Sequence, residues 1–309
     1  MMPEVGVSLP PPEGPLRVAA EVADAATAAG LAAVQIRSVT ELEELEAVHA
    51  LYASIWRSNA NPPVTTELLR ALTKAGNYVA GAFDGPELVG ACVGFFSAPA
   101  EGAMHSHITG VSLRARRHNV GFALKLHQRA WALRRGVTMI EWTFDPLVSR
   151  NAYFNLAKLA ADPAEYLPNF YGAMGDVING GDDSDRLLVH WNLHSAGVAE
   201  ACAGRPRLGD VAYERASGAV TALDIAPDGS PVAGSHSGEV SLVAVPSDIE
   251  AIRATDPALA RQWRVALRET LAELMGQDRA LRYDPSGWYI LGASSSSDSA
   301  GRVAQGPPH

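Results

Sequence analysis

Between Met104 and Leu133 the chain runs from a strand through a short basic loop into a long helix, and this stretch constrains its fold most strongly. Apolar residues alternate up to Leu113, which is typical of a strand. From Ala123 onward they recur at helical spacing. The residues that join the two elements are Arg116, Arg117, His118, Asn119, Val120, Gly121, Phe122 and Ala123.

This loop predicts a site for a small anion. The first N–H groups of a helix have no partners inside the helix, so an anion can bind them. Gly121 permits a close approach of the backbone, and Asn119 is a residue type that tolerates positive φ. Seven Arg or Lys residues and no Asp or Glu lie between Arg114 and Arg135, in a chain of net charge -9. A polyanionic small ligand is therefore expected, and not a nucleic acid, which would call for a basic domain.

The loop also carries a family resemblance. The pattern Arg116-x-x-Asn119-x-Gly121 resembles the Arg/Gln-x-x-Gly-x-Gly/Ala pyrophosphate loop of the GNAT superfamily, the acyl-coenzyme A N-acyltransferases. It departs from the family at Asn119, where glycine is usual. A bacterial subgroup of GNAT acyltransferases is similar in a further stretch, which comprises Trp142, Thr143, Phe144, Asp145, Pro146, Leu147, Asn151 and Asn155.

The resemblance implies an α/β (α+β) protein with the GNAT fold, a mixed and mostly antiparallel sheet flanked by helices, and with a C-terminal α/β extension. Apolar runs and alternation predict strands at residues 34–39, 78–83, 88–96, 105–113, 138–144 and 186–191. Helical spacing predicts helices within residues 40–56, 66–76, 123–133 and 149–161. The order of these elements is the GNAT order over residues 33–195.

Four segments are expected along the chain: a disordered or frayed leader (1–32), the GNAT domain (33–195), the extension (196–292) and a disordered tail (293–309). The extension is expected to begin as a linker over residues 194–208 and to contain short strands and a long helix. That helix has an apolar stripe of Leu259, Trp263, Leu267, Leu271 and Leu274. We expect the stripe to pack on the GNAT core or on a second subunit in a homodimer.

Acylation of an amine requires a base that takes its proton and an N–H group that holds the oxyanion. In many GNAT members the base is a glutamate about eleven residues before the phosphate-loop arginine, and here that position falls near His105. His105 and His107 share one face of a strand, and histidine is a reasonable base near neutral pH. The alternatives are surface histidines, or a His-x-His zinc site that lacks a nearby third ligand. We predict no metal.

The acid that protonates the leaving thiolate is usually a tyrosine, which follows an asparagine on the fourth GNAT helix. Asn151 and Asn155 are present, but Leu156 occupies the tyrosine position. Tyr153 or Tyr171 is then expected to replace that tyrosine from another direction, with Tyr171 our catalytic candidate. Alternatively, the thiolate leaves without a dedicated donor.

The remaining site residues also follow from the resemblance. The coenzyme is expected to contact Val111, Leu113, Arg116, Arg117, His118, Asn119, Val120, Gly121, Phe122, Ala123, Asn151 and Asn155. The acceptor is expected to contact Trp56, Asn61, His107, Trp142, Arg150 and Arg186. Asp145 is a further catalytic candidate that would bind the acceptor amine, and Arg150 or Arg186 would bind an acceptor carboxylate. The structural alternatives are a turn for Asp145, a surface pair for Arg186, a core tryptophan for Trp56 and a turn for Asn61.

Composition adds few further constraints. No run approaches eighteen apolar residues and the first residues lack a signal pattern, so we expect a cytoplasmic protein that does not enter the membrane. Cys92 and Cys202 are too few and too far apart in sequence to indicate a disulfide framework or a metal site. The absence of a Gly-Lys-Ser/Thr loop argues against a kinase.

Together these features predict an acyl-coenzyme A-dependent N-acyltransferase. Acetyl-coenzyme A is the expected donor, with a longer acyl group such as succinyl as the alternative. The acyl group would pass to the amine of a small molecule by direct attack in a ternary complex. The competing hypothesis is a non-catalytic GNAT-like module that binds or senses an acyl-coenzyme A.

Overall fold

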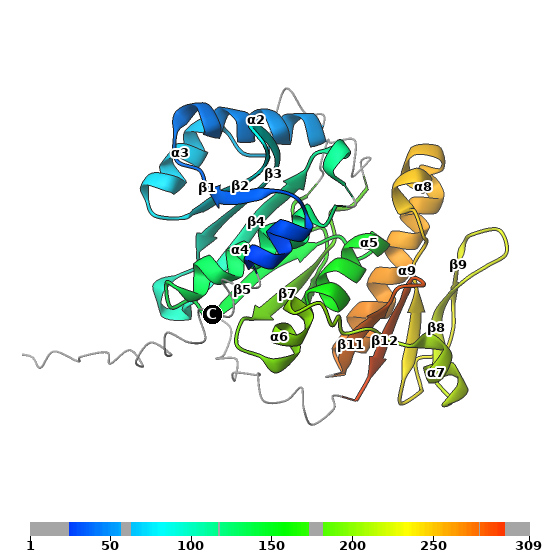
Figure 1. The fold of residues 1–309 in the computed structure, drawn as a ribbon. Helices are drawn as coiled ribbons and strands as arrows, with labels where there is room; N and C mark the ends of the chain where they lie inside the picture. The colour runs from blue at the N-terminus through cyan, green and yellow to red at the C-terminus, as the bar shows by residue number, and fades with distance from the viewer. Residues whose placement is uncertain (1–24, 57–62, 117, 173–181, 278, 294–309) are drawn as a thin grey trace, which may run out of the picture.

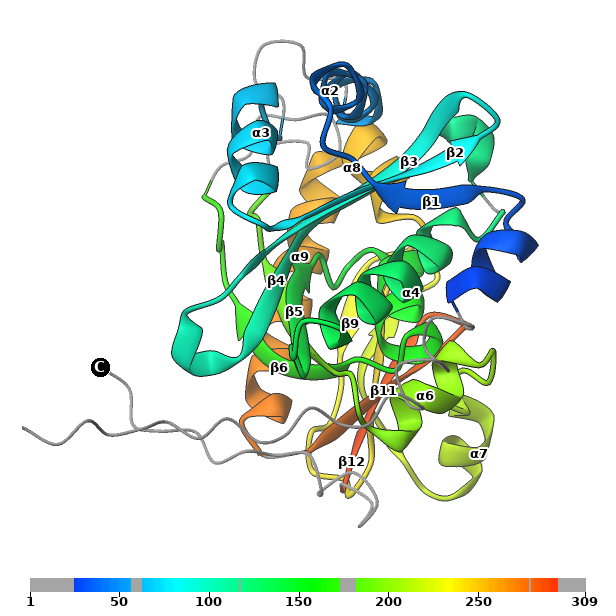
Figure 2. The same cartoon turned by 60° about the vertical axis from the view of Figure 1, so that its left-hand side comes forward.

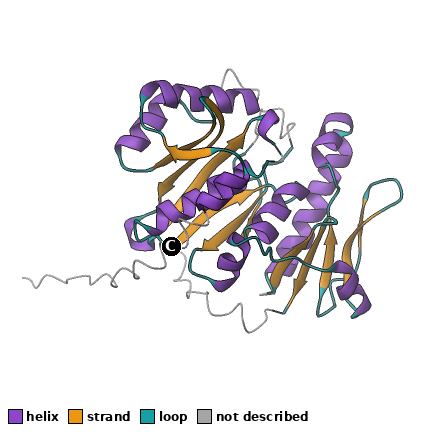
Figure 3. Ribbon diagram, viewed as in Figure 1, coloured by secondary structure: helices purple, strands orange, loops and turns teal. Residues whose placement is uncertain are grey.

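The protein contains two β-sheets that share one core (Figure 1). The structure is a computed structural model that describes residues 25–56, 63–116, 118–172, 182–277 and 279–293. Its first sheet has seven strands in the order β1-β2-β3-β4-β5-β7-β6, and its second has five in the order β11-β12-β10-β8-β9. Both sheets are mixed and helices flank them, which confirms the predicted α/β class (Figure 3).

The first sheet is antiparallel except between β4 and β5. Its strands are β1 (Gln35–Ser38), β2 (Tyr78–Asp84), β3 (Glu87–Phe96), β4 (Ala103–Val111), β5 (Met139–Phe144), β6 (Asp162–Leu167) and β7 (Arg186–Asn192). Six of these strands were predicted and β6 was not. The missed strand lies at the edge of the sheet and contains Pro163, which a central strand would exclude.

Helices cover the first sheet on both faces (Figure 2). On one face, the α2 face, α2 (Leu42–Trp56) and α3 (Thr66–Lys74) bury apolar residues against β2, β3 and β4. On the other, the α4 face, lies α4 (Val120–Leu133), together with α5 (Ser149–Ala152) and the π-helical segment η3 (Tyr153–Lys158). These positions confirm the helices predicted from apolar spacing.

The two parallel strands separate soon after they meet. β4 and β5 pair at only three positions, which end at His105 opposite Glu141. Beyond this point β4 stays paired with β3 as far as Val111, while β5 stays paired with β7 as far as Phe144. The edge of β4 from Ser106 onward is therefore not paired with β5. We call this point of separation the fork.

Part of the expected leader belongs to the core. Residues 25–31 form a helix, and Ala25, Ala28 and Ala32 are buried in the same core as α4. The prediction of a frayed leader is wrong for this part, because small alanine side chains allow a helix to pack closely without large apolar residues. Residues 1–24 of the leader and 294–309 of the tail lie outside the described residues.

The extension is more regular than expected. It comprises α6 (Ala196–Cys202), α7 (Val211–Ala216), β8 (Val220–Ile225), β9 (Pro231–Ala233), β10 (Ser241–Ala244), α8 (Ile249–Thr255), α9 (Pro257–Met275), β11 (Ala280–Asp284) and β12 (Trp288–Gly292). The predicted linker is wrong in part, because α6 occupies it with Ser195 as its N-cap. No helix in the described part of the chain is long and apolar enough to span a membrane.

α9 joins the two sheets into one core. It contacts β6 of the first sheet and β8, β9 and β10 of the second. Four of the five predicted stripe residues are fully buried: Trp263, Leu267, Leu271 and Leu274. The stripe therefore packs within the same chain.

A buried group of charges also links the extension to the loop after β5. Arg264 donates to both carboxylate oxygens of Asp145 at 2.9 Å and to Asp182 at 3.1 Å. Arg253 donates to Asp145 at 2.6 Å. All four side chains are buried, so each charge depends on the others for compensation. We call these four residues the ionic cluster.

Removing one charge from the ionic cluster should destabilise the protein. Asp145→Asn should lower the free energy of unfolding by about 3 kcal/mol, because it leaves buried arginine charge uncompensated. Burial raises the pKa of Asp145, but the charges of Arg264 and Arg253 outweigh this effect and hold the pKa well below its ordinary value. The stabilisation is thus complete above about pH 4 and is lost as the pH falls further. Urea unfolding at several pH values measures both effects.

The matched control is Asp183→Asn, which removes a half-exposed partner of Arg268. An exposed ion pair contributes little, so this variant should unfold within about 1 kcal/mol of the wild type. Equal losses in the two variants would mean that the ionic cluster has no special part in stability.

Candidate functional site

A row of titratable side chains crosses the α2 face at the fork. Cross-strand pairing puts His105 of β4 opposite Glu141 of β5, and Glu141 opposite His190 of β7. The His190 Nε2 atom lies 3.8 Å from a carboxylate oxygen of Glu141. Phe95 packs on the His105 ring at a centroid distance of 5.1 Å. An acid thus lies between two imidazoles where β4 and β5 separate.

His105 lies in β4, at one end of this row, but it is a weak base. Its ring lies beside that of His107, with 6.2 Å between the centroids. Burial, with smaller effects from the neighbouring His107 and Lys125, lowers the pKa of His105 to about 4. The imidazole is therefore neutral near pH 7, and its conjugate acid is far stronger than that of a base tuned to neutral pH.

Glu141 was not among the predicted site residues, yet it occupies the centre of the row. Its carboxylate accepts a hydrogen bond from Ser97 at 3.3 Å and is a quarter exposed. One feature of the sequence could have indicated Glu141, namely an acid in a strand whose other residues are mostly apolar. The sequence does not show which strands lie beside one another, so this signal did not distinguish a site residue from an ordinary surface residue.

The α4 face of the fork carries a buried lysine. The Lys125 Nζ atom donates to Ser106 Oγ at 2.7 Å and to Gln128 Oε1 at 3.2 Å. It also lies 3.7 Å from the ring centroid of Trp142. Burial lowers the pKa of Lys125 to about 8. Ser106 and Trp142 are the residues that directly follow the last paired positions of β4 and β5.

Two predicted contacts are revised by this packing. Trp142, expected to touch the acceptor, points into the core on the α4 face and donates to Asn155 Oδ1 at 3.0 Å. Asn155, expected to touch the coenzyme, is buried and orients that indole. Leu156, at the position where the GNAT resemblance implies a tyrosine, is also fully buried.

The loop before α4 has the geometry that the sequence predicts. Asn119 is the N-cap residue at φ 60° and ψ 14°, in the left-handed region, and its side chain makes no capping bond. The first helical bond is donated by Ala123 to the Asn119 carbonyl, so the preceding N–H groups of the first turn are not used by the helix. A Cβ atom at Gly121 would meet nothing nearer than Val111, at 3.8 Å. The N-terminus of α4 is open to a ligand.

Lys158 is a further cation at this loop that the sequence did not indicate. Its Nζ atom donates to Asn119 Oδ1 at 2.6 Å and lies 4.9 Å from the ring centroid of Phe122. It belongs to η3, which tertiary packing brings beside the start of α4. Arg116 lies exposed in the same loop, and Arg117 is outside the described residues.

The stretch from Arg114 to Arg135 presents less positive charge to solvent than its seven basic residues suggest. Lys125 and Arg129 are buried, and Arg129 donates to the Leu193 carbonyl. Arg114 pairs with Glu87, and Arg135 stacks on a tryptophan. Periodicity alone did not reveal that part of this charge faces the sheet.

Asp145 and Arg150 are revised as acceptor ligands. Asp145 belongs to the ionic cluster, where the two arginines bind its carboxylate. Arg150 forms a bidentate pair with Glu250 of α8, at 2.6 Å for both bonds. Both side chains therefore attach the extension to the region after β5.

Other predicted residues do lie on the α2 face. The Tyr171 hydroxyl is 3.2 Å from Thr143 Oγ1, two residues after Glu141 on the same side of β5. Arg186 lies 5.2 Å from the ring centroid of Tyr171 and donates to the Asp185 carbonyl. Tyr171 is therefore near the row of titratable side chains, on the opposite face from Lys125.

The first helical region reaches the same face. Trp56, at the end of α2, would lie 3.1 Å from a Cβ at Gly110, so it packs directly on β4. Asn61 lies outside the described residues. Of the residues predicted to contact the coenzyme, Leu113 is largely exposed, and the Asn151 N–H group donates to the Val148 carbonyl.

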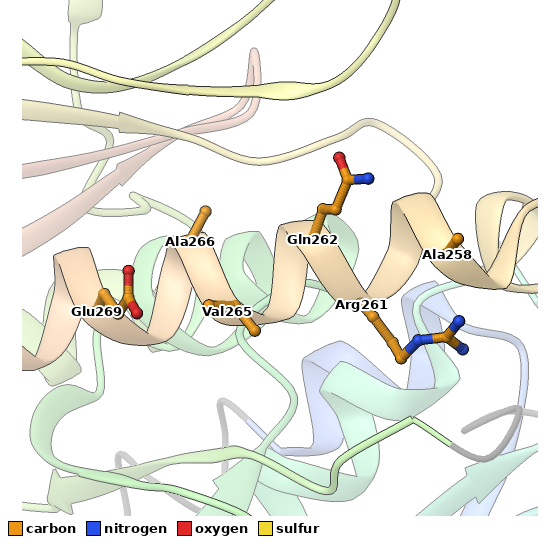
Figure 4. Close-up of a pocket in the computed structure, with 6 residues that line it drawn as sticks. All are labelled: Ala258, Arg261, Gln262, Val265, Ala266 and Glu269. Carbon is orange, nitrogen blue, oxygen red and sulfur yellow. The ribbon is translucent and has the colours of Figure 1, made fainter.

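Away from the fork, the described residues contain a hollow on α9 and no metal-binding group. A hollow of about 480 Å³ lies along one side of α9, lined by residues from successive turns (Figure 4): Ala258, Arg261, Gln262, Val265, Ala266 and Glu269. It contains none of the residues at the fork. Among the residues described here, no group of three or more His, Cys, Asp or Glu side chains is arranged to hold a metal ion.

No protein-family model matches the sequence, and no curated protein matches it. Solved structures are similar over about half of the chain. One is an N-acetyltransferase of Staphylococcus aureus Mu50, 17% identical, covering 52% of this chain and 98% of its own, with a TM-score of 0.42. Another is the ribosomal-protein-S18-alanine N-acetyltransferase of Escherichia coli. It is 15% identical, and the match covers 53% of this chain and 96% of its own, with a TM-score of 0.42. A third is yncA of Salmonella typhimurium with its cofactor acetyl-CoA. It is 16% identical, and the match covers 54% of this chain and 98% of its own, with a TM-score of 0.44.

The electrostatic environment of His105 can be measured directly. Because burial lowers its pKa from 6.5 to about 4, its ring signal in NMR should not titrate until the pH falls well below 6. The unfolded chain binds this proton first, so the free energy of unfolding should fall between pH 6.5 and 4. His127, whose burial also lowers its pKa to about 4, acts in the same direction. His105→Gln should remove part of the acid sensitivity, and a His105 midpoint near 6.5 would contradict the assignment.

Proposed function

We propose that this protein is an acyl-coenzyme A-dependent N-acyltransferase with a GNAT fold, and that acetyl-coenzyme A donates the acyl group to a small-molecule amine. The observation that carries the proposal is that β4 connects two features. Its C-terminal end leads to the open N-terminus of α4, and its middle forms one side of the fork. A ligand with a pyrophosphate at one end and a thioester at the other matches this arrangement.

The coenzyme would lie along the free edge of β4. From Ser106 to Val111 this edge is about 17 Å long, at roughly 3.3 Å per residue, and it is not paired with β5. The amide groups of a pantetheine arm can bond to such an edge as an added strand does. The first-turn N–H groups of α4, with Lys158 and Arg116, would hold the pyrophosphate. The coenzyme supplies an activated acyl thioester.

The α2 face would hold the acceptor. Glu141 would take the proton from the attacking amine, and the neutral His105 ring would line the same pocket. β4 also bulges at His107, since Val93 is opposite Ile108 while Gly94 is opposite Ser106. A bulged residue leaves the ladder, so its N–H group is a candidate to hold the carbonyl oxygen of the thioester.

The alternative is a non-catalytic module that binds acyl-coenzyme A, favoured by the buried Leu156 at the tyrosine position. Release of free thiol from acetyl-coenzyme A with a broad panel of amines distinguishes the two. Turnover with any amine supports the enzyme, whereas coenzyme binding without turnover supports the module.

The proposed coenzyme site can be tested at the loop before α4. Gly121→Glu places a negative charge at the N-terminus of α4, where the pyrophosphate would bind, and should raise the coenzyme A dissociation constant at least about tenfold. The fold should persist, because the surroundings of Gly121 are open. Calorimetric titration with coenzyme A measures the affinity.

The control for this experiment is Asn119→Gly. Glycine adopts the left-handed conformation of Asn119 without strain, so the affinity should stay close to that of the wild type. Unchanged binding by the Gly121→Glu variant would remove the basis for the proposed coenzyme site.

A further prediction of this proposal concerns the base. Glu141→Gln should lower kcat about a hundredfold at neutral pH, with partial recovery at high pH as the amine loses its proton unaided. His105→Gln is the matched comparison on the neighbouring strand. A larger loss in the His105 variant would restore histidine as the base, as the sequence predicts, and no loss in either would exclude both.

A further inference from the structure

Lys125 is a buried cation at the fork that the proposed function leaves without a role. Its bonded neighbours, Ser106 and Gln128, are both neutral, and no ion pair to Lys125 is found among the described residues. An uncompensated buried ammonium is unfavourable, so a group of this kind is a candidate for chemistry.

We propose that Lys125 is the general acid that protonates the coenzyme sulfur as it leaves. The inference rests on the function proposed above. It gives this chain a proton donor at the step for which the family resemblance implies a tyrosine.

The geometry places the lysine on the correct side of the fork. Ser106 and Trp142 each follow the last paired residue of their strand, and Nζ lies between them on the α4 face. Side chains alternate along a strand, so Glu141 projects from the opposite face of the same gap. A thioester in the gap would have the base and the amine on one side and the lysine on the other.

The proton affinity of Lys125 suits this role. Burial lowers its pKa to about 8, close to the value of about 8.5 that is usual for a thiol. Proton transfer from the ammonium to a thiolate is then nearly balanced in free energy, which favours efficient acid catalysis. The developing negative charge on sulfur would also supply the counter-charge that the site lacks.

The groups that face Lys125 come from three elements. On β3, burial raises the pKa of the Cys92 thiol, which accepts a hydrogen bond from Thr109 at 3.1 Å. On β4, Ser106 accepts a hydrogen bond from the ammonium, and the neutral His105 projects from the opposite face of the strand, where the charge of Lys125 still lowers its pKa. β5 contributes the uncharged Trp142. Cys92 is thus the one thiol of the described chain that competes with the coenzyme for this ammonium.

The step balances in atoms and electrons. The amine lone pair forms the new C–N bond to the acyl carbon, and the C–S bond breaks with its electron pair on sulfur. Glu141 accepts the proton that the amine nitrogen loses, and Lys125 Nζ gives a proton to sulfur. Lys125 is left as a neutral amine and regains a proton from solvent, while Glu141 returns one to solvent.

The test compares coenzyme A with desulfo-coenzyme A, which lacks the thiol. An ammonium that gives its proton to the leaving sulfur also stabilises the thiolate form of bound coenzyme A. The complex should therefore hold the ammonium–thiolate pair in part, and binding of coenzyme A below about pH 8 should release up to one proton. Desulfo-coenzyme A should release none through this group. The ratio of the affinity for coenzyme A to the affinity for desulfo-coenzyme A should therefore increase as the pH rises toward 8, by up to about tenfold per pH unit. Calorimetry in buffers of different ionisation enthalpy measures the proton release on the wild-type protein.

Two lysine variants separate the roles at the two ends of the ligand. Lys125→Met should abolish the proton release, remove the preference for coenzyme A, and lower kcat about a hundredfold. Lys158→Met, at the phosphate loop, should weaken both ligands equally and leave the proton release unchanged. Cys92→Ala should keep the proton release, because the titrating thiol belongs to the coenzyme.

The outcomes are distinct. Both ligands binding with the same pH dependence in the wild type would overturn the role of Lys125 and leave the proposed function intact. Loss of the proton release in Cys92→Ala would assign the proton to the protein's own thiol and would also overturn it. Binding of neither ligand to the wild type would overturn the proposed function and this inference together.

Discussion

The early end of pairing between β4 and β5 is the constraint on which the candidate site depends. Each strand keeps a full ladder on its other side, β4 with β3 and β5 with β7, so the two can separate without losing their place in the sheet. One edge of β4 is left free to bond to a ligand. Because side chains alternate, the gap has a carboxylate and imidazoles on the α2 face and a lysine on the α4 face.

The extension supports one side of this gap. The loop after β5 is held by the ionic cluster through Asp145, and the Tyr289 hydroxyl donates to the Pro146 carbonyl at 2.7 Å. The start of α5 is held in the same way, since the Tyr283 hydroxyl donates to Ser149 Oγ at 2.8 Å. The second sheet therefore braces the end of β5 while β4 follows β3. Asp145 and Arg150, which the resemblance implies as acceptor-binding residues, instead bind arginine and glutamate side chains of the extension.

Burial also changes what the charged residues near α4 can do. A helix that covers a sheet turns some of its side chains inward, and Lys125 and Arg129 are among them. Arg129 donates to the Leu193 carbonyl at 2.8 Å, and Lys125 donates to Ser106 Oγ at 2.7 Å and to Gln128 Oε1. At the N-terminus of α4, Lys158 of η3 donates to Asn119 and adds a positive charge beside the first-turn N–H groups. The local charge of the loop before α4 is thus set by two segments that are distant in sequence.

The sequence by itself determined the elements whose signals are local. Apolar spacing predicted six strands of the first sheet and its main helices, and residue type predicted the left-handed Asn119 before Gly121. Only the tertiary structure decided which side chains meet. Register across β4, β5 and β7 brings Glu141 between two histidines, and packing encloses Asp145 between arginines that follow it by more than a hundred residues. Such contacts depend on pairing between distant segments, whereas periodicity reports only which face of its own element a residue occupies.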